Sequence, residues 1–173
     1  LTVREQGIAN SDVRLVAYTS DAAHGCIAQA MEIVGLGSDS LRRIPLNDQY
    51  QIDVSALEEA IVADRNQGNT PFLIVGTAGS VDVGSIDDLN SRADVAQREG
   101  LWLHIDGAYA ALGMLAPELA PLLAGIERAD SLAFDFHKWG QVPYDAGFIL
   151  VRDGNLHLKT FFSSATYLRR DHR

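Results

Sequence analysis

LWLHIDGAYA at 101–110 and DSLAFDFHKW at 130–139 are the two segments that decide the fold. Each contains a mainly apolar run of strand length, at 101–105 and at 131–134; Asp106 follows the first run and Lys138 follows the second. Taking an isolated carboxylate or ammonium out of water is costly unless an opposite charge or a hydrogen bond compensates it. The two segments therefore predict a ligand that contacts both charged groups.

The chain around these segments alternates between strand and helix patterns. Strands are expected at 13–18, 41–46, 72–75, 101–105, 131–134 and 148–151, helices at 22–34, 53–63 and 87–100, and an irregular stretch at 114–123. Nearly continuous apolar strands are typical of a parallel sheet covered by helices. The alternation predicts one α/β domain with a mainly parallel sheet and helices on both faces. Ligands of such sheets bind beyond the carboxyl ends of the strands.

Composition narrows the class of protein. With 173 residues, 47% hydrophobic and 21% charged, the chain has the balance of a globular domain. A net charge of −9 argues against a nucleic-acid or anionic-membrane surface. The single cysteine, Cys26, indicates a reducing compartment, hence a cytoplasmic protein. No apolar run has membrane-spanning length, and the N-terminus has no signal-peptide pattern.

Pyridoxal phosphate meets the requirements of both charged residues. Its ring nitrogen takes a carboxylate, which suits Asp106, and its aldehyde condenses with an amine, which suits Lys138. On its own, Asp106 is more often a helix cap, and a lone lysine is usually solvated. The small residues Gly107 and Ala108 favour the ligand, because they let a flat ring approach the backbone.

The neighbours of Lys138 point the same way. His137 and Trp139 flank it just after an apolar strand, so we expect the amine to be partly desolvated and its pKa lowered.

Among the other histidines, His104 is expected to be a packed or interstrand polar residue, whereas His157 and His172 carry no signal. The sequence lacks Walker, dinucleotide and Gly-x-Ser-x-Gly motifs, and its histidines lack metal-ligand spacing.

Four segments, in order, carry a resemblance to a known family. They are SDAAHGCIAQA around His24, GTAGSVDVGSIDDL at 76–89, HIDGAYA around Asp106 and DFHKW around Lys138. Together they resemble the pyridoxal-phosphate-dependent group II amino-acid decarboxylases, which include the aromatic-amino-acid and glutamate enzymes. The resemblance implies the large domain of a fold-type-I enzyme that converts an L-amino acid to an amine and CO₂ as a homodimer with active sites at the subunit interface.

The resemblance also implies roles for individual residues. Lys138 would form the Schiff base, Asp106 would hold the ring nitrogen, and His24 would stack on the ring opposite Ala108 and act on the substrate. His137 would help to hold the phosphate. The implied catalytic residues are Lys138, His24 and Asp106, and the implied cofactor-binding residues are His24, Ser80, Asp106, Ala108, Asp135, His137 and Lys138.

Two positions depart from the family pattern. Val81 stands where many members have a second threonine, so that Ser80 keeps a single hydroxyl there. Asp135 stands where an asparagine is common, and we expect its carboxylate to turn to backbone amides or to bind through a donor, because a phosphate repels it.

The resemblance assigns 1–173 to part of the cofactor-binding large domain, with an N-terminal segment and a C-terminal small domain outside it, and it likens 163–173 to the approach to a mobile loop. Two alternatives stay open. One is another fold-type-I enzyme, such as a carbon–carbon lyase or a desulfurase, since substrate orientation decides which bond breaks. The other is a catalytically silent dimerisation scaffold, which Val81 favours.

Overall fold

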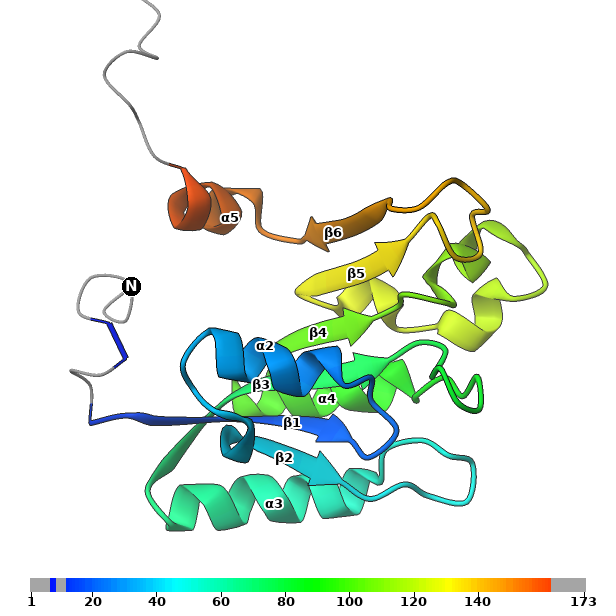
Figure 1. Cartoon of the computed structure of the whole chain (residues 1–173). Coiled ribbons are helices and arrows are strands. Elements are labelled where there is room, and N and C mark those ends of the chain that lie inside the picture. Colours follow the sequence, from blue (N-terminus) through cyan, green and yellow to red (C-terminus); the bar gives the residue numbers. More distant parts are fainter. Residues whose placement is uncertain (1–6, 9–11, 163–173) are drawn as a thin grey trace, which may run out of the picture.

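A computed structural model describes residues 7–8 and 12–162, and its centre is a six-stranded sheet in the order β2-β1-β3-β4-β5-β6 (Figure 1). The strands are β1 (Arg14–Ser20), β2 (Leu41–Ile44), β3 (Asn69–Thr77), β4 (Trp102–Asp106), β5 (Ser131–Asp135) and β6 (Gly147–Val151). Strands β1 to β5 run parallel, and β6 pairs with β5 in the antiparallel sense. The prediction of a mainly parallel sheet is confirmed.

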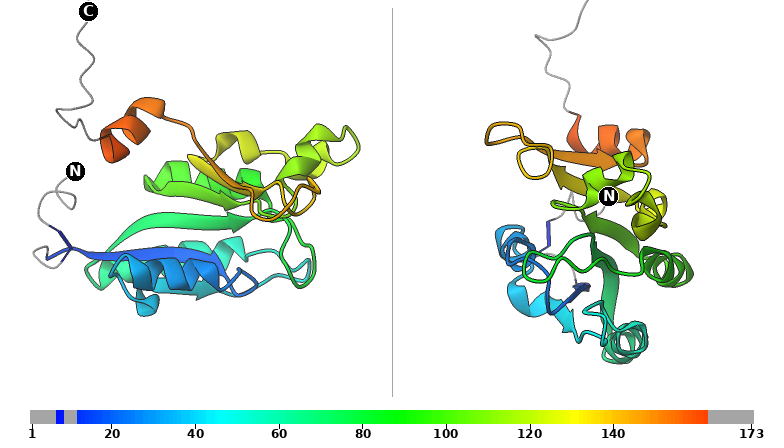
Figure 2. Two further views of the ribbon diagram at one scale, coloured as in Figure 1. Left: turned by 45° about the horizontal axis from the view of Figure 1, so that its top comes forward. Right: turned by 90° about the vertical axis from the view of Figure 1, so that its right-hand side faces the viewer.

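Helices cover both faces of this sheet, as predicted. They are α2 (Cys26–Ile33), α3 (Val54–Asn66), α4 (Leu89–Glu99) and α5 (Gly154–Phe161). Figure 2 shows α2 on one face and α3 with α4 on the other. Short 3₁₀ turns at Ala111–Leu115, Ala120–Leu123 and Ile126–Arg128 lie in the region between β4 and β5. Within the described ranges, no helix combines the length and apolarity needed to cross a bilayer.

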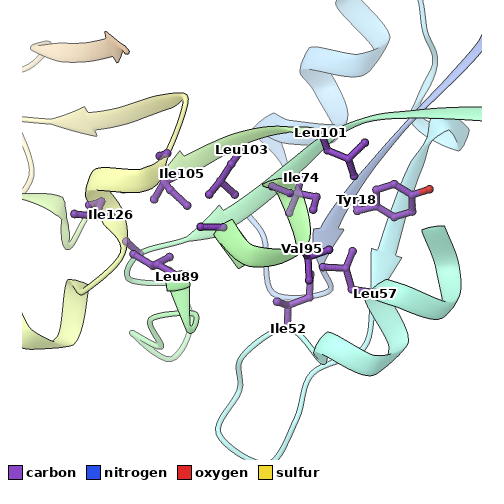
Figure 3. Close-up of a cluster of buried hydrophobic side chains, with 14 of the residues drawn as sticks. Tyr18, Ile52, Leu57, Ile74, Leu89, Val95, Leu101, Leu103, Ile105 and Ile126 are labelled. Carbon is purple, nitrogen blue, oxygen red and sulfur yellow. The ribbon is translucent and has the colours of Figure 1, made fainter. Parts of the chain in front are cut away.

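The main core lies between the sheet and the α3–α4 layer (Figure 3). The strand residues Tyr18, Ile74 and Leu103 contribute to it, together with Leu57 of α3 and Val95 of α4, and each is at most 1% exposed. A smaller cluster on the opposite face packs Met31 of α2 against Ala17 and Leu41. Burial of these apolar surfaces is the main favourable contribution to folding.

Several predicted boundaries are wrong by a few residues, for local reasons. Helix α2 begins at Cys26 rather than at 22, because His24 Nδ1 accepts the Cys26 N–H at 3.2 Å in a preceding turn. Strand β2 ends at Ile44, before Pro45, which has no N–H for the ladder. Asp88 caps α4 by accepting the Ser91 N–H at 3.1 Å, where the sequence suggested a start at 87.

Strand β3 is longer than the predicted 72–75, because its ends carry polar residues and a proline. Pro71 sits inside it beside the register shift between Val16 and Ala17 of β1, which accommodates the missing N–H. Helix α5 was not predicted. Its sequence signal is Asp153, whose carboxylate accepts the N–H groups of Asn155 and Leu156.

Candidate active site

A cavity of about 470 Å³ opens at the carboxyl ends of the central strands. Its walls come from the β1–α2 loop, α2, the ends of β3, β4 and β5, and the loops that follow them. Six of the seven predicted site residues line it, namely His24, Ser80, Asp106, Ala108, Asp135 and Lys138. Thus the fold brings together residues from four separate sequence segments.

Asp106 ends β4 and stands at the middle of the rim. In the sheet register it lies between Thr77 of β3 and Ala133 of β5. Its Oδ1 accepts the Ala108 N–H at 3.1 Å, and its carbonyl accepts the Ala78 N–H at 2.8 Å. These bonds fix the half-buried carboxylate at the cavity wall.

Lys138 forms an ion pair that the sequence did not predict. Its Nζ lies 2.8 Å from Oδ2 of Asp135 and 4.5 Å from the centre of the Tyr109 ring. Partial burial pulls the pKa of the Lys138 amine down, but the hydrogen bond and charge of Asp135, with smaller effects of Tyr109 and Asp106, raise it overall. The expected lowering of this pKa is therefore wrong, and Trp139, at 53% exposed, shields the amine little.

Asp135 takes the second of the two partners expected for it. Its carboxylate binds a donor, the Lys138 ammonium, rather than backbone amides, and its Oδ2 lies 3.7 Å from Nε2 of His137. The physical reason is that a carboxylate at the end of β5 finds an ammonium three residues later, which is a stronger partner than an amide.

His137 is the predicted cofactor residue that does not line the cavity. Its Nδ1 accepts the Ala146 N–H at 2.8 Å, and its ring lies 4.2 Å from that of Tyr144. In this structure His137 therefore joins the end of β5 to the segment before β6.

Two other histidines do line the cavity. His24 holds the start of α2 through its bond to the Cys26 N–H, with its ring at the cavity wall. Burial lowers the pKa of His104, although Asp106 opposes the shift, and its Nδ1 lies 2.8 Å from Oγ of Ser131 on β5. His104 is an interstrand polar residue, as expected, but it also belongs to the cavity.

Close packing near Asp106 leaves no room for a side chain at two glycine positions. A Cβ at Gly107 would meet the Cβ of Ala111 at 2.6 Å, and a Cβ at Gly79 would meet that of Ala110 at 2.9 Å. Gly79 also has a φ of 88°, which favours glycine. Gly107 does not line the cavity, whereas Ala108 does.

The cavity residues that were not predicted from the sequence include Thr77, Tyr109 and Cys26. Tyr109 lies in the quoted HIDGAYA motif, three residues after Asp106, so its position there was an available signal. Thr77 had no local signal, because its place beside Asp106 depends on the register between β3 and β4.

The cavity residues fit pyridoxal phosphate. A carboxylate, a primary amine and a small face residue converge on a space of a size common for small-ligand sites. Within the described residues, Oγ1 of Thr77 is a buried hydroxyl without a hydrogen-bond partner, which leaves a polar contact available to a ligand. Together with the sheet, this site defines a cofactor-binding α/β domain of the fold-type-I class.

The chain belongs to the pyridoxal-dependent decarboxylase family, because the profile of the "Pyridoxal-dependent decarboxylase conserved domain" matches residues 2–173. This confirms the family recognised from the motifs and pyridoxal phosphate as that family's cofactor.

Individual relatives agree with the family match. The chain is 38% identical to an aromatic-L-amino-acid decarboxylase of Bacillus atrophaeus, over 98% of this chain and 35% of that protein. It is 40% identical to the histidine decarboxylase of Mus musculus, over 91% of this chain and 23% of that protein. A crystal structure of Oryza sativa TDC with PLP and tryptamine superposes with a TM-score of 0.89 at 30% identity, covering 98% of this chain and 36% of that one. The chain thus spans about a third or less of the length of these proteins.

Proposed function

We propose that this chain is part of an enzyme that removes the α-carboxylate of an L-amino acid as CO₂ and uses pyridoxal phosphate as cofactor. The observation that carries the proposal is the convergence of Asp106, Ala108 and Lys138 on one cavity at the carboxyl ends of the strands. The relatives support the reaction class, since they are named decarboxylases. Their names differ in substrate, so the proposal extends to the class of L-amino acids.

Pyridoxal phosphate, when bound, supplies an aldehyde that condenses with an amine and a ring that withdraws electrons from the substrate α-carbon. In our proposal Lys138 provides the amine to which the aldehyde attaches between turnovers. The Asp106 carboxylate accepts a hydrogen bond from the ring nitrogen and so keeps a proton there. His24 and Ala108 hold the ring from two different elements, and His24 contacts the substrate carboxylate. At the end of β5, Asp135 holds the Lys138 ammonium. His137, two residues after Asp135, helps to hold the cofactor phosphate.

The same proposal covers the organisation of the protein. We assign 1–173 to the cofactor-binding large domain, which agrees with its coverage of about a third of an aromatic-L-amino-acid decarboxylase. We also propose a cytoplasmic homodimer with active sites at the interface. Exposed apolar side chains on β6 and α5 support a covered surface there, among them Phe148, Ile149, Leu158 and Phe161. Light scattering of the whole protein measures its oligomeric state.

The proposal that the cofactor attaches to Lys138 can be tested directly, because the chain contains two lysines, Lys138 and Lys159. Lys138 lines the cavity, whereas Lys159 lies on α5. Borohydride reduction of the cofactor-loaded protein should fix the cofactor to the peptide that contains Lys138, as read by mass spectrometry. Recovery of the cofactor on Lys159 would refute the assignment.

The reaction is tested with the whole protein, cofactor and a panel of aromatic, imidazole and acidic L-amino acids. At least one should yield its amine and CO₂ in equal amounts. A keto acid or an aldehyde without amine would instead favour another fold-type-I reaction. No turnover of any kind by cofactor-loaded protein would favour a silent scaffold. Lys138→Ala is the matched control, since it removes the reactive amine from the cavity.

A further inference from the structure

We propose that Thr77, and not Ser80, supplies the hydroxyl that hydrogen-bonds the pyridine-based cofactor beside Asp106. The inference rests on the proposed cofactor binding and assigns a contact within that site.

Thr77 has the geometry of a ligand-binding residue. It is the last residue of β3, is 7% exposed and lines the cavity. Its register partner on β4 is Asp106. Side chains of paired residues on neighbouring strands point to the same face of a sheet. The side chains of Thr77 and Asp106 therefore stand side by side at the cavity wall.

The Thr77 hydroxyl has no partner among the residues that the structure describes. A buried polar group without a hydrogen bond is destabilising and rare, and it is found where a ligand, a water or an ion completes the site. Thr77 faces a cavity of about 470 Å³, so a bound ligand can provide the missing partner.

The backbone of Thr77 is fixed by Asp87. The Thr77 N–H donates to Oδ2 of Asp87 at 2.8 Å, and the Asp87 N–H donates to the Thr77 carbonyl at 2.9 Å. Oδ1 of the same buried carboxylate accepts the Ile52 N–H at 2.8 Å. Because these bonds hold the strand end, the hydroxyl is placed before a ligand arrives, which reduces the entropy lost on binding.

Ser80, by contrast, uses its hydroxyl inside its own turn. Its Oγ lies 2.9 Å from Oγ of Ser85 and accepts the Ser85 N–H at 3.2 Å. The next residue, Val81, offers no hydroxyl. The 79–85 turn therefore contributes shape to the cavity, while Thr77 contributes the available hydroxyl.

The experiment compares Thr77→Val, Thr77→Ser and Ser80→Ala in the whole protein after removal of cofactor. Dissociation constants for pyridoxal phosphate are measured by equilibrium dialysis, and melting temperatures are measured with and without it. Thr77→Val should weaken binding about tenfold, as expected for one lost hydrogen bond. Its cofactor-free melting temperature should equal or exceed that of the wild type, because an unpaired buried hydroxyl is gone.

The other two variants separate the hydroxyl from the shape of the site. Thr77→Ser keeps the hydroxyl and should bind within about threefold of the wild type. Ser80→Ala should lower the cofactor-free melting temperature, since the turn loses two bonds, but should leave affinity within about threefold. If the valine variant does not fold, Thr77→Ala provides the same comparison.

Unchanged affinity in Thr77→Val, or a tenfold loss in Ser80→Ala alone, would overturn this inference while leaving the proposed function standing. Wild-type protein that binds no pyridoxal phosphate would overturn both.

Discussion

Oδ2 of Asp135 lies 2.8 Å from Nζ of Lys138, so the amine proposed to bind the cofactor is held as an ammonium by a carboxylate three residues earlier. The Tyr109 ring, 4.5 Å from the same Nζ, favours the same charge state. An ammonium is not nucleophilic, so Lys138 must lose its proton before it can attach to an aldehyde. Asp135 therefore holds the amine in place and opposes its deprotonation.

Replacing Asp135 by asparagine should lower the pKa of Lys138. The Asp135 carboxylate is the main cause that raises this pKa, against partial burial, so its removal shifts deprotonation to lower pH. Acylation of Lys138 in cofactor-free protein, followed by mass spectrometry across pH, measures the midpoint. Asp48→Asn, at an exposed residue, makes the same change in net charge and should leave the midpoint in place.

Asp106→Asn should retain the fold and bind cofactor but lose turnover by orders of magnitude. The amide keeps an oxygen that can accept the Ala108 N–H, so the turn after β4 is preserved. It cannot hold a proton on the ring nitrogen as a carboxylate does, and loss of one partner of such a pair is worth several kcal/mol. Steady-state kinetics measure the loss of turnover, and cofactor absorbance measures the retained binding. Near-wild-type turnover would refute the proposed role of Asp106 at the ring nitrogen.

The thiol of Cys26 should react slowly and become protected by the cofactor. Cys26 is an exposed residue, but partial desolvation, helped by Asp106 and opposed by Lys138, raises the pKa of its thiol, so less thiolate is present near neutral pH than in a free cysteine. Cys26 lines the cavity and is the single cysteine of the chain. Iodoacetamide labelling should therefore accelerate with pH above the ordinary cysteine range and slow when pyridoxal phosphate is added. Equal rates with and without cofactor would contradict its placement in the cavity.

Gly79→Ala should be more destabilising than Gly84→Ala, although both glycines have positive φ, 88° and 70°. A Cβ at Gly84 meets nothing within 4 Å, so that variant carries only the backbone strain, roughly 1–2 kcal/mol. A Cβ at Gly79 would also lie 3.1 Å from the backbone nitrogen of Ala110, and such overpacking adds about 1–3 kcal/mol. Urea unfolding of both variants checks the difference, and equal losses would contradict the close approach.

Asp64→Asn should lower stability at neutral pH by about 2 kcal/mol and flatten its dependence on acid. Burial alone raises the pKa of Asp64, but hydrogen bonds from Arg42, Asn69 and Tyr18 outweigh it, and this pKa is lowered. The carboxylate therefore stabilises the fold above its unfolded pKa of about 3.9, and that contribution is lost as the pH falls through the lower folded value.

Urea unfolding at pH 7 and at acid pH measures this difference, which should shrink toward low pH. Asp94→Asn is the matched control. Asp94 is paired with Arg128 at 2.6 Å, but its side chain is 65% exposed, so its loss should change stability by less than about 1 kcal/mol at either pH. An equal effect of the two variants would contradict the burial argument.

The alternation of strands and helices and the place of Asp106 at a strand end could be predicted from the sequence. Apolar runs, helix caps and prolines act on neighbours within a few residues, so their consequences can be inferred along the chain. One boundary error falls where a tertiary contact competes with the local pattern. Asp87, expected to start α4, is instead buried and holds Thr77, while Asp88 takes the cap.

The contacts of the site depended on the tertiary structure. The register of β3 against β4 places Thr77 beside Asp106, although the two residues are far apart in the sequence. The backbone path after β5 brings Asp135 to Lys138 and places His137 where it accepts the Ala146 N–H. A hydrogen bond or an ion pair depends on distances of a few ångströms, and folding sets those distances among residues whose local patterns carry no information about one another.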